Sequence, residues 1–148
     1  MESFTFSNQM LPEEYNELRK SVDWSELTPA QAERGLAHTT FLVAVRDGEQ
    51  IIGMGRILFD YGYTAYLGDV IVCPQYQGRG IGKQIVQMLM EQTMSATDEG
   101  DRIMFILGAA KGKEPFYEKL GFQIRPNDVS GHGMFQWRKK KSNTEGQA

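Results

Sequence analysis

A glycine-rich turn is the stretch of this sequence best suited to chemistry. Three glycines stand at alternate positions, Gly78, Gly80 and Gly82, with Arg79 between them and Lys83 after them. A β-branched run precedes the turn, and an apolar pattern of helical period follows it. The first amides of a helix lack partners within the helix, and glycines let an anion approach those amides without meeting a Cβ atom. The turn therefore predicts a phosphate site.

Two common nucleotide-binding motifs do not fit this turn. The P-loop motif has Lys83 in place after a glycine, but Gln84 stands where it needs Ser or Thr, and Gln77 stands where it needs its first glycine. The dinucleotide motif G-x-G-x-x-G fails because the third glycine comes one residue early. The phosphate must belong to another kind of ligand.

The spacing that fits is Gln77-x-x-Gly80-x-Gly82, after a strand that ends in Val72-Cys73-Pro74. It resembles the coenzyme A pyrophosphate loop of the GNAT superfamily of N-acetyltransferases. A second stretch, "FYEKLGF" at 116–122, is similar to that superfamily's late helix and following strand. The resemblance covers most of the chain and implies acetyl-CoA as co-substrate. The loop residues that it implies in binding are Gln77, Gly78, Arg79, Gly80, Ile81, Gly82 and Lys83.

A narrower resemblance points to a small-amine branch that includes plant serotonin N-acetyltransferases and uncharacterised bacterial relatives. The stretches that carry it are "VDW", "GMGRILFD", "GDVIVCPQYQGRGIG" and "GMFQW". The chain departs from the superfamily at Ala110, where an asparagine that contacts the cofactor often stands. This departure implies a different grip near the pantetheine arm.

In this superfamily an amine attacks the thioester directly. The developing oxyanion then needs donors, and the departing thiolate benefits from a proton. The resemblance implies that backbone amides of Val70 or Ile71 face the acetyl carbonyl and that Val72 faces the pantetheine. Tyr117, within "FYEKLGF", is the predicted acid, because a phenol with a pKa of about 10 is protonated at neutral pH.

The base that takes the amine proton is left open between Asp69, Asp60 and a water molecule. Asp60 is equally well explained as a turn residue, and Asp69 as a brace for a neighbouring loop. The predicted acceptor-binding residues are Trp24, Asp60 and Asp69. Trp24 could form an aromatic wall with Tyr61, Tyr63 and Tyr66, although ordinary packing is the alternative.

A nucleophilic pair of Cys73 with a histidine stays open, although the motif asks for no particular chemistry at that position. His38 and His132 lack metal-ligand spacing, and no metal is predicted.

The hydrophobic pattern predicts an α/β protein with a mixed, mostly antiparallel sheet and helices on both faces, and the resemblance implies that the sheet contains a splayed parallel pair. The strand at 102–109 is apolar on both faces, which predicts a central position. The expected elements are strands at 3–7, 64–72, 102–109 and 133–139, a hairpin at 39–59, and helices at 11–22, 28–38, 113–122 and from Ile81 onward.

Length and composition predict a single domain with a disordered polar tail over 141–148, and the resemblance implies that residues 1–140 form an N-acetyltransferase domain. Hydrophobic residues make up 41% and the formal net charge is −3, which gives no reason to expect nucleic acid or a membrane as partner. One cysteine and the lack of a signal-peptide pattern predict a cytoplasmic protein. Apolar residues in the final strand suggest a homodimer.

The leading hypothesis is therefore an acetyl-CoA-dependent N-acetyltransferase acting on a small primary amine. Two alternatives stay open: acetylation of a protein lysine or N-terminus, and a non-catalytic acyl-CoA-binding module.

Overall fold

The computed structural model describes residues 3–142 of the chain, so the predicted polar tail lies outside the described residues from position 143 onward. The chain divides into two units, residues 1–107 and 108–148. The sheet and the helices that pack on it belong to the first unit, whereas the "FYEKLGF" stretch belongs to the second.

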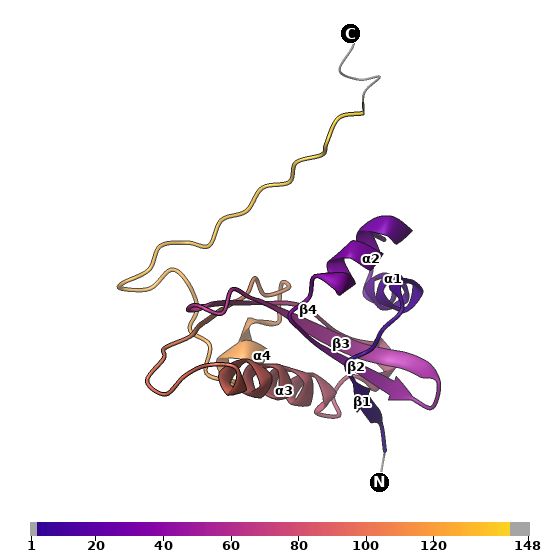
Figure 1. Cartoon of the computed structure of the whole chain (residues 1–148), viewed down its shortest axis with the longest axis horizontal. Helices are drawn as coiled ribbons and strands as arrows, with labels where there is room; N and C mark the ends of the chain where they lie inside the picture. Colours follow the sequence, from indigo (N-terminus) through magenta and orange to yellow (C-terminus); the bar gives the residue numbers. More distant parts are fainter. Residues whose placement is uncertain (1–2, 143–148) are drawn as a thin grey trace. The chain divides into compact units, whose positions relative to one another are not determined.

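The first unit is built on a mixed five-stranded sheet with the order β1-β2-β3-β4-β5 (Figure 1). Neighbouring strands are antiparallel except β4 and β5, which are parallel. This arrangement confirms the predicted fold class. The strands are β1 (Thr5–Ser7), β2 (Phe41–Asp47), β3 (Gln50–Phe59), β4 (Thr64–Val72) and β5 (Met104–Ile106).

Helices cover both faces of this sheet, as predicted (Figure 1). α1 (Pro12–Ser21) and α2 (Pro29–Ala37) lie on one face, and α3 (Ile81–Ser95) lies on the other. The Thr28 hydroxyl accepts a hydrogen bond of 3.2 Å from the backbone N–H of Gln31 and so caps the start of α2.

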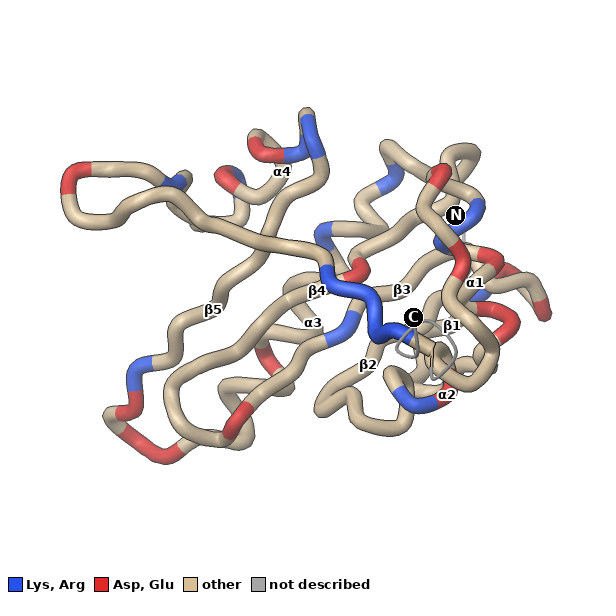
Figure 2. The backbone as a smooth tube through the Cα atoms, turned by 90° about the horizontal axis from the view of Figure 1, so that it is seen from above, with Lys and Arg blue, Asp and Glu red and all other residues tan. Residues whose placement is uncertain are grey.

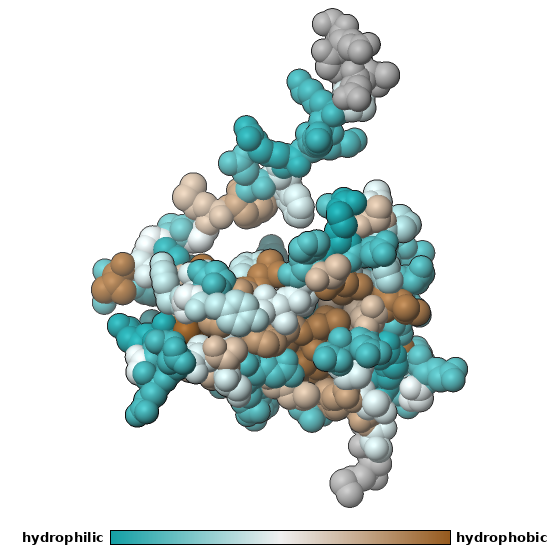
Figure 3. All heavy atoms as spheres, in the orientation of Figure 1, coloured by the Kyte–Doolittle hydropathy of each residue, from teal (hydrophilic) through white to brown (hydrophobic). Residues whose placement is uncertain are grey.

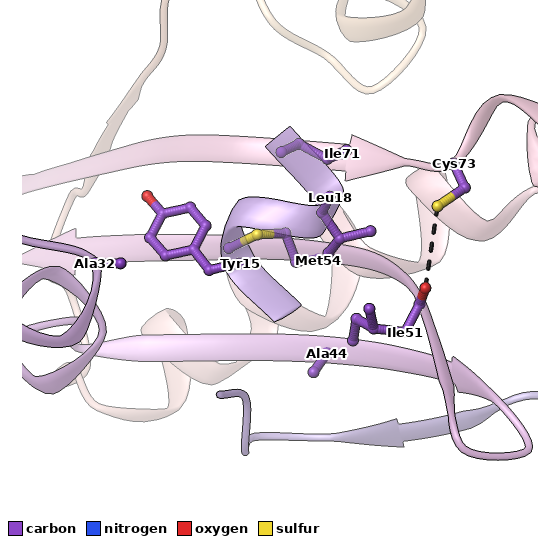
Figure 4. Close-up of a cluster of buried hydrophobic side chains, with 8 residues drawn as sticks. All are labelled: Tyr15, Leu18, Ala32, Ala44, Ile51, Met54, Ile71 and Cys73. Carbon is purple, nitrogen blue, oxygen red and sulfur yellow. Dashed lines mark hydrogen bonds between the residues drawn. The ribbon is translucent and has the colours of Figure 1, made fainter. Parts of the chain in front are cut away.

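The core between α1, α2 and the sheet is drawn in Figure 4. Leu18 lies beside Met54 and Ile71, and all three are almost fully buried. Burying an aliphatic side chain of this size contributes about 1.5–3 kcal/mol. Tyr15 joins the cluster through its ring, while its hydroxyl points away from Leu18 and Met54 (Figure 4). The same helix thus supplies both packing and a polar group.

α3 packs against bare backbone of β3. A Cβ atom placed on Gly55 would lie 2.6 Å from Cγ2 of Ile85 and 2.9 Å from Cδ1 of Leu89. Ile85 and Leu89 are fully buried and belong to the apolar face of α3. The absence of a side chain at Gly55 therefore sets how closely α3 approaches the sheet.

Two sequence predictions about strands are wrong. The strand predicted at 102–109 is not central: β5 is short and lies at the sheet edge, where Met104 is 42% exposed. The strand predicted at 133–139 does not form, because no described strand offers its backbone a hydrogen-bonding partner. Apolar side chains alone predict a strand, but only a neighbouring strand makes one.

Over the described part of the second unit, residues 108–142, there is one short helix, α4 (Glu114–Glu118). The ring of Tyr117 packs edge-on against Phe116 and Phe122, with ring centroids 4.9 Å and 5.8 Å apart. Residues 119–142 contain no helix or strand, and Met134, Phe135 and Trp137 are exposed. Figure 3 shows hydrophobic spheres within this segment, and Figure 2 shows the basic run that follows them toward the C-terminus.

We predict that Gly55→Ala and Gly35→Ala change stability in opposite directions. Gly55→Ala forces two buried side chains of α3 to move and should lower the free energy of unfolding by about 1–3 kcal/mol. Gly35 lies within α2, and a Cβ atom there meets nothing within 4 Å. Gly35→Ala should therefore raise the free energy of unfolding by about 0.5–1 kcal/mol. Urea unfolding measures both, and equal stability of the Gly55 variant and the wild type would contradict the packing described.

Candidate functional site

The glycine turn joins the end of β4 to the start of α3. A short 3₁₀ helix, Pro74–Tyr76, follows β4, and then Gly78 and Gly80 take the left-handed backbone conformation, with φ of +79° and +82°. Gly80 is the N-cap of α3, and a Cβ atom on either glycine would meet nothing within 4 Å. The turn is therefore open to a ligand and formed by backbone that other residues adopt only with strain.

The helix start provides the donors that the sequence predicts. The first hydrogen bond within α3 runs from the N–H of Gln84 to the carbonyl of Gly80, at 3.1 Å. The amides of Ile81, Gly82 and Lys83 precede that bond, so they have no partner within the helix. They stand at the positive end of the helix dipole, which is a favourable place for an anion.

Side chains around the turn hold it in shape. The Gln77 amide donates to the carbonyl of Val72 at 2.9 Å, and Arg79 donates to the carbonyl of Gln75 at 3.0 Å. The Tyr76 hydroxyl donates to Asp47 at 2.7 Å, and this hydrogen bond raises the pKa of Tyr76. Two of the predicted cofactor residues, Gln77 and Arg79, thus contact the protein's own backbone.

β4 contains one extra residue on the way to the turn. Met54 pairs with Ile71, but Arg56 pairs with Gly68, so Asp69 and Val70 together stand opposite the single residue between Met54 and Arg56. Such a bulge disrupts the ladder of hydrogen bonds locally. The backbone predicted to face the acetyl carbonyl therefore lies where regular pairing is interrupted.

The parallel pair separates just before this bulge. β4 and β5 pair only from Thr64 with Met104 to Tyr66 with Ile106. Val70–Val72 lie beyond the last pair, at the end of β4 that leads into the glycine turn. The splay, the bulge and the turn thus follow one another along a single stretch of backbone.

The side chain of Asp69 is surrounded by donors. Its carboxylate accepts hydrogen bonds from the Tyr15 hydroxyl, from Nη1 of Arg19 at 3.2 Å and from Nε of Arg56 at 2.7 Å. Arg56 also donates to the Thr39 hydroxyl at 3.0 Å. Asp69 has a left-handed φ of +50°, a conformation that Asp tolerates better than most residues. We call Tyr15, Arg19, Arg56 and Asp69 the Asp69 cluster.

The charge states of the Asp69 cluster follow from burial and contact. Burial, followed by the hydrogen bond to Asp69, raises the pKa of Tyr15 to about 12. Burial lowers the pKa of Arg56, but the hydrogen bond to Asp69 and the nearby negative groups outweigh it and leave that pKa raised. Tyr15 is therefore neutral near pH 7 and Arg56 is charged. Sequence reasoning missed Tyr15, Arg19 and Arg56, because nothing in their spacing shows that they meet Asp69.

The structure brings one predicted acceptor residue to the Asp69 cluster and places another, Asp60, at the end of β4 away from the glycine turn. Trp24 lies with its ring 5.6 Å from the guanidinium of Arg19. Asp60 caps the β3–β4 turn, accepting from the N–H of Gly62 at 2.8 Å. That turn and the glycine turn lie at opposite ends of β4, roughly 25 Å apart at the rise of a strand. No ring contact joins Trp24 to Tyr61, Tyr63 or Tyr66 within the described residues.

The structure also shows the surroundings of Cys73 and His38, the residues considered in the sequence as a nucleophile and as a metal ligand. Cys73 is buried, and burial raises the pKa of its thiol, which favours the protonated form. Nδ1 of His38 contacts the carbonyl of Arg34 at 2.8 Å. Over residues 3–142, no group of His, Cys, Asp and Glu is arranged to hold a metal ion. No helix in this part of the chain is long and apolar enough to cross a membrane.

Comparison with known sequences decides what this site belongs to. The sequence model of the acetyltransferase (GNAT) domain matches residues 37–124, which include β4, the glycine turn, α3 and "FYEKLGF". The chain belongs to the GNAT family of acetyltransferases.

Relatives of this GNAT chain come from plants, algae and bacteria. It is 36% identical over 98 residues to GCN5-related N-acetyltransferase 2, chloroplastic, of Arabidopsis thaliana, covering 63% of this chain and 36% of that protein. It is 28% identical over 122 residues to an uncharacterised N-acetyltransferase, ycf52, of Porphyra purpurea, covering 80% and 68%. The chain spans only about a third of the length of the plant proteins that it matches.

Solved structures share the GNAT fold. The crystal structure of SA2161, a probable acetyltransferase of Staphylococcus aureus, has a TM-score of 0.81 and 28% identity, covering 92% of this chain and 100% of that one. Glucosamine-6-phosphate N-acetyltransferase of Arabidopsis thaliana, at 18% identity and a TM-score of 0.67, covers 88% and 99% and shows the fold alone.

Two predicted positions of this GNAT domain lie in the second unit. Tyr117 belongs to α4, and its catalytic part stays a prediction. Ala110 is exposed, and its carbonyl accepts a hydrogen bond of 2.9 Å from the N–H of Lys113. The effect of alanine in place of the frequent asparagine also stays a prediction.

The Asp69 cluster makes stability depend on alkaline pH. Below pH 10 Tyr15 keeps its proton in both states, so its contribution is fully present. Between pH 10 and about 12 the unfolded chain loses that proton while the folded protein retains it, so stability falls as pH rises. We expect the wild type to lose about 3 kcal/mol more than Tyr15→Phe across this window. Parallel slopes of unfolding free energy against pH for the two proteins would contradict this prediction.

Proposed function

We propose that this protein transfers the acetyl group of acetyl-CoA to a primary amine by direct attack of the amine on the thioester. The observation that carries the proposal is the succession of splay, bulge and glycine turn along the end of β4 and the start of α3. An extended ligand with a phosphate at one end and a thioester at the other needs donors spaced along a path. This stretch of backbone supplies them in sequence.

We assign each part of acetyl-CoA to residues along this stretch of backbone. The amides at the start of α3 bind the pyrophosphate, with the exposed Lys83 adding charge, while Gln77 and Arg79 hold the turn in shape. The amide of Val70 or Ile71 at the bulge stabilises the oxyanion, and Val72 contacts the pantetheine arm. Gly78, Gly80, Ile81 and Gly82 contribute backbone only.

The proton transfers are assigned to Tyr117 and to water. Tyr117 protonates the departing thiolate as general acid. Asp69 is the candidate base from the sequence, but its carboxylate already accepts from a tyrosine and two arginines. Taking a proton would break those ion pairs, so we favour the alternative in which Asp69 braces the bulge and water carries the amine proton away. Asp60 serves the β3–β4 turn.

We prefer a small molecule as the acceptor, and we place it on the same face of the sheet as Trp24. A protein acceptor is the second candidate, because one relative, 35% identical over 83 residues, is named histone acetyltransferase TAP1 of Glycine max.

The compartment we propose is the cytoplasm, with a plastid as alternative because relatives are named chloroplastic. If no amine is acetylated, the protein is instead a non-catalytic acyl-CoA-binding module.

The glycine turn gives a test of cofactor binding with a matched control. Gly80→Glu puts a side chain and a negative charge where the pyrophosphate is proposed to bind, and Gly48→Glu makes the same change at φ +61° in the β2–β3 turn. Calorimetry with acetyl-CoA should show affinity lowered at least tenfold in the Gly80 variant and unchanged in the Gly48 variant. Wild-type affinity in a folded Gly80→Glu protein would remove the assignment.

Tyr117 and Asp69 separate an enzyme from a binding module. Tyr117→Phe keeps the ring packing and deletes the donor, so kcat should fall roughly 100-fold while acetyl-CoA affinity stays the same. Tyr63→Phe, at an exposed tyrosine, is the control and should leave kcat unchanged.

Asp69→Asn should chiefly lower the free energy of unfolding, as expected for a brace. A roughly 100-fold fall in kcat with stability intact would instead make Asp69 the base.

A homodimer is proposed from the exposed apolar residues of the second unit, Met134, Phe135 and Trp137. Such side chains are costly to leave in water, and a second copy would cover them. Light scattering should give twice the chain mass at micromolar concentrations, whereas a monomer mass at every concentration would remove the dimer.

A further inference from the structure

We infer that the acceptor amine also carries a carboxylate, which binds the outward-facing guanidinium of Arg19. This inference rests on the proposed function and names its substrate class. It assigns to the Asp69 cluster a role in specificity beyond bracing the bulge.

The first argument is charge. Arg19 and Arg56 together carry two positive charges and share the single carboxylate of Asp69, so the Asp69 cluster keeps one positive charge in excess. Their side chains are only 15% and 19% exposed. A charge so far withdrawn from water is costly unless an opposite charge accompanies it. A bound anion would supply that charge.

Nearby acidic residues are engaged elsewhere. Glu14 pairs with Arg46 at 2.6 Å, and Glu26 pairs with Lys20 at 3.7 Å. Glu17 and Asp23 are exposed, and no described ion pair joins either of them to Arg19. The excess charge of the Asp69 cluster therefore remains available to a ligand.

The second argument is rigidity. Nε of Arg19 donates to the carbonyl of Ser25 at 2.7 Å, and Nη1 donates to Asp69 at 3.2 Å. The guanidinium also lies 5.9 Å from the ring centre of Tyr15 and 5.6 Å from that of Trp24. A surface arginine loses side-chain freedom when it binds an anion, whereas Arg19 is already fixed.

The third argument is an unused donor. Nε and Nη1 of Arg19 have partners, and Nη2 has none among the described residues. In the same part of the chain no buried side-chain nitrogen or oxygen lacks a partner, so Nη2 must reach solvent. Nη2 of Arg56 likewise has no partner among the described residues, since Nε donates to Asp69 and Nη1 donates to Thr39. Arg19 is the arginine of the cluster that lies beside Trp24, the predicted acceptor residue, with its guanidinium 5.6 Å from the ring centre.

The contacts of Arg19 connect its Nη2 group to the proposed site of acetyl transfer. Arg19 contacts the side chain of Asp69, and Asp69 forms the bulge together with Val70, whose amide is proposed to face the acetyl carbonyl. An acceptor whose carboxylate binds Nη2 of Arg19 would hold its amine a few bonds away, toward the bulge. Amino acids and other acid-bearing amines have this form, whereas arylalkylamines without an acid group leave the charge unmatched.

Matched pairs of acceptors test the inference. Each pair differs by one carboxylate: tryptophan and tryptamine, lysine and cadaverine, γ-aminobutyrate and propylamine. With saturating acetyl-CoA, we expect kcat/KM corrected for the free-amine fraction to favour the acid-bearing member of at least one pair by about 10-fold or more, the size of a charge-assisted hydrogen bond. Equal or better use of the decarboxylated members in every pair would overturn the inference.

Arg19→Met and Lys20→Met show whether Arg19 is responsible. Both remove one positive charge from the last turn of α1, but Lys20 is 74% exposed and, among the described residues, forms an ion pair with Glu26 alone. The preference for the acid-bearing acceptor should collapse in Arg19→Met and persist in Lys20→Met. A preference that survives Arg19→Met in a folded protein would overturn the assignment to Arg19.

A binding measurement keeps this inference separate from the proposed function. Calorimetry of the wild type with N-acetyltryptophan and N-acetyltryptamine, in the presence of coenzyme A, needs no turnover. Tighter binding of the acid, lost in Arg19→Met, would support the carboxylate site even if no amine were acetylated, which would refute only the proposed function. Equal binding of the two ligands, together with turnover of decarboxylated amines, would refute only the carboxylate site.

Discussion

The site depends on one feature of β4, the bulge in which Asp69 and Val70 together stand opposite a single residue of β3. Residues that pair across strands share a face of the sheet, so Leu67 lies with Ile57 and Ile71 lies with Met54. Ile57 and Met54 are three positions apart and point to opposite faces, so Leu67 and Ile71 do too, although they are four positions apart. The bulge is what makes this possible. It lets β4 bury Leu67 on the α3 side and Ile71 on the α1 side.

The Asp69 cluster stabilises this irregular backbone. A left-handed conformation costs an ordinary residue roughly 1–2 kcal/mol, and Asp69 adopts it while accepting hydrogen bonds from Tyr15, Arg19 and Arg56. Those donors come from α1 and β3, so the bulge is fixed from two sides. The same contacts bring an excess positive charge to the α1 side of the sheet. One set of side chains thus determines both the backbone geometry and the local electrostatics.

The glycine turn shows a similar division between backbone and side chains. Gln77 and Arg79 are two of the polar residues of the motif, and both donate to carbonyls of the protein. Gly78 and Gly80 take left-handed conformations and leave the space above the turn open. The motif therefore works by fixing the course of the backbone. The donors proposed for the cofactor are mainly backbone amides, so no further side chain is needed as a donor.

The sequence by itself determined much of this protein, because the deciding signals are local. Hydrophobic periodicity and the alternating glycines each act within a few residues, and they predicted α1, α2, the hairpin, β4 and the start of α3. Local patterns failed where a partner was needed: β5 lies at the edge, and the segment 133–139 forms no strand.

Only the tertiary structure decided what surrounds Asp69. Tyr15 and Arg19 are about 50 residues away in sequence and Arg56 is on another strand, and ion pairs between such distant residues leave no periodic signal. The sequence showed that a carboxylate stands beside the proposed oxyanion amide. Whether that carboxylate is free to take a proton depends on which donors folding brings to it, and folding brings three.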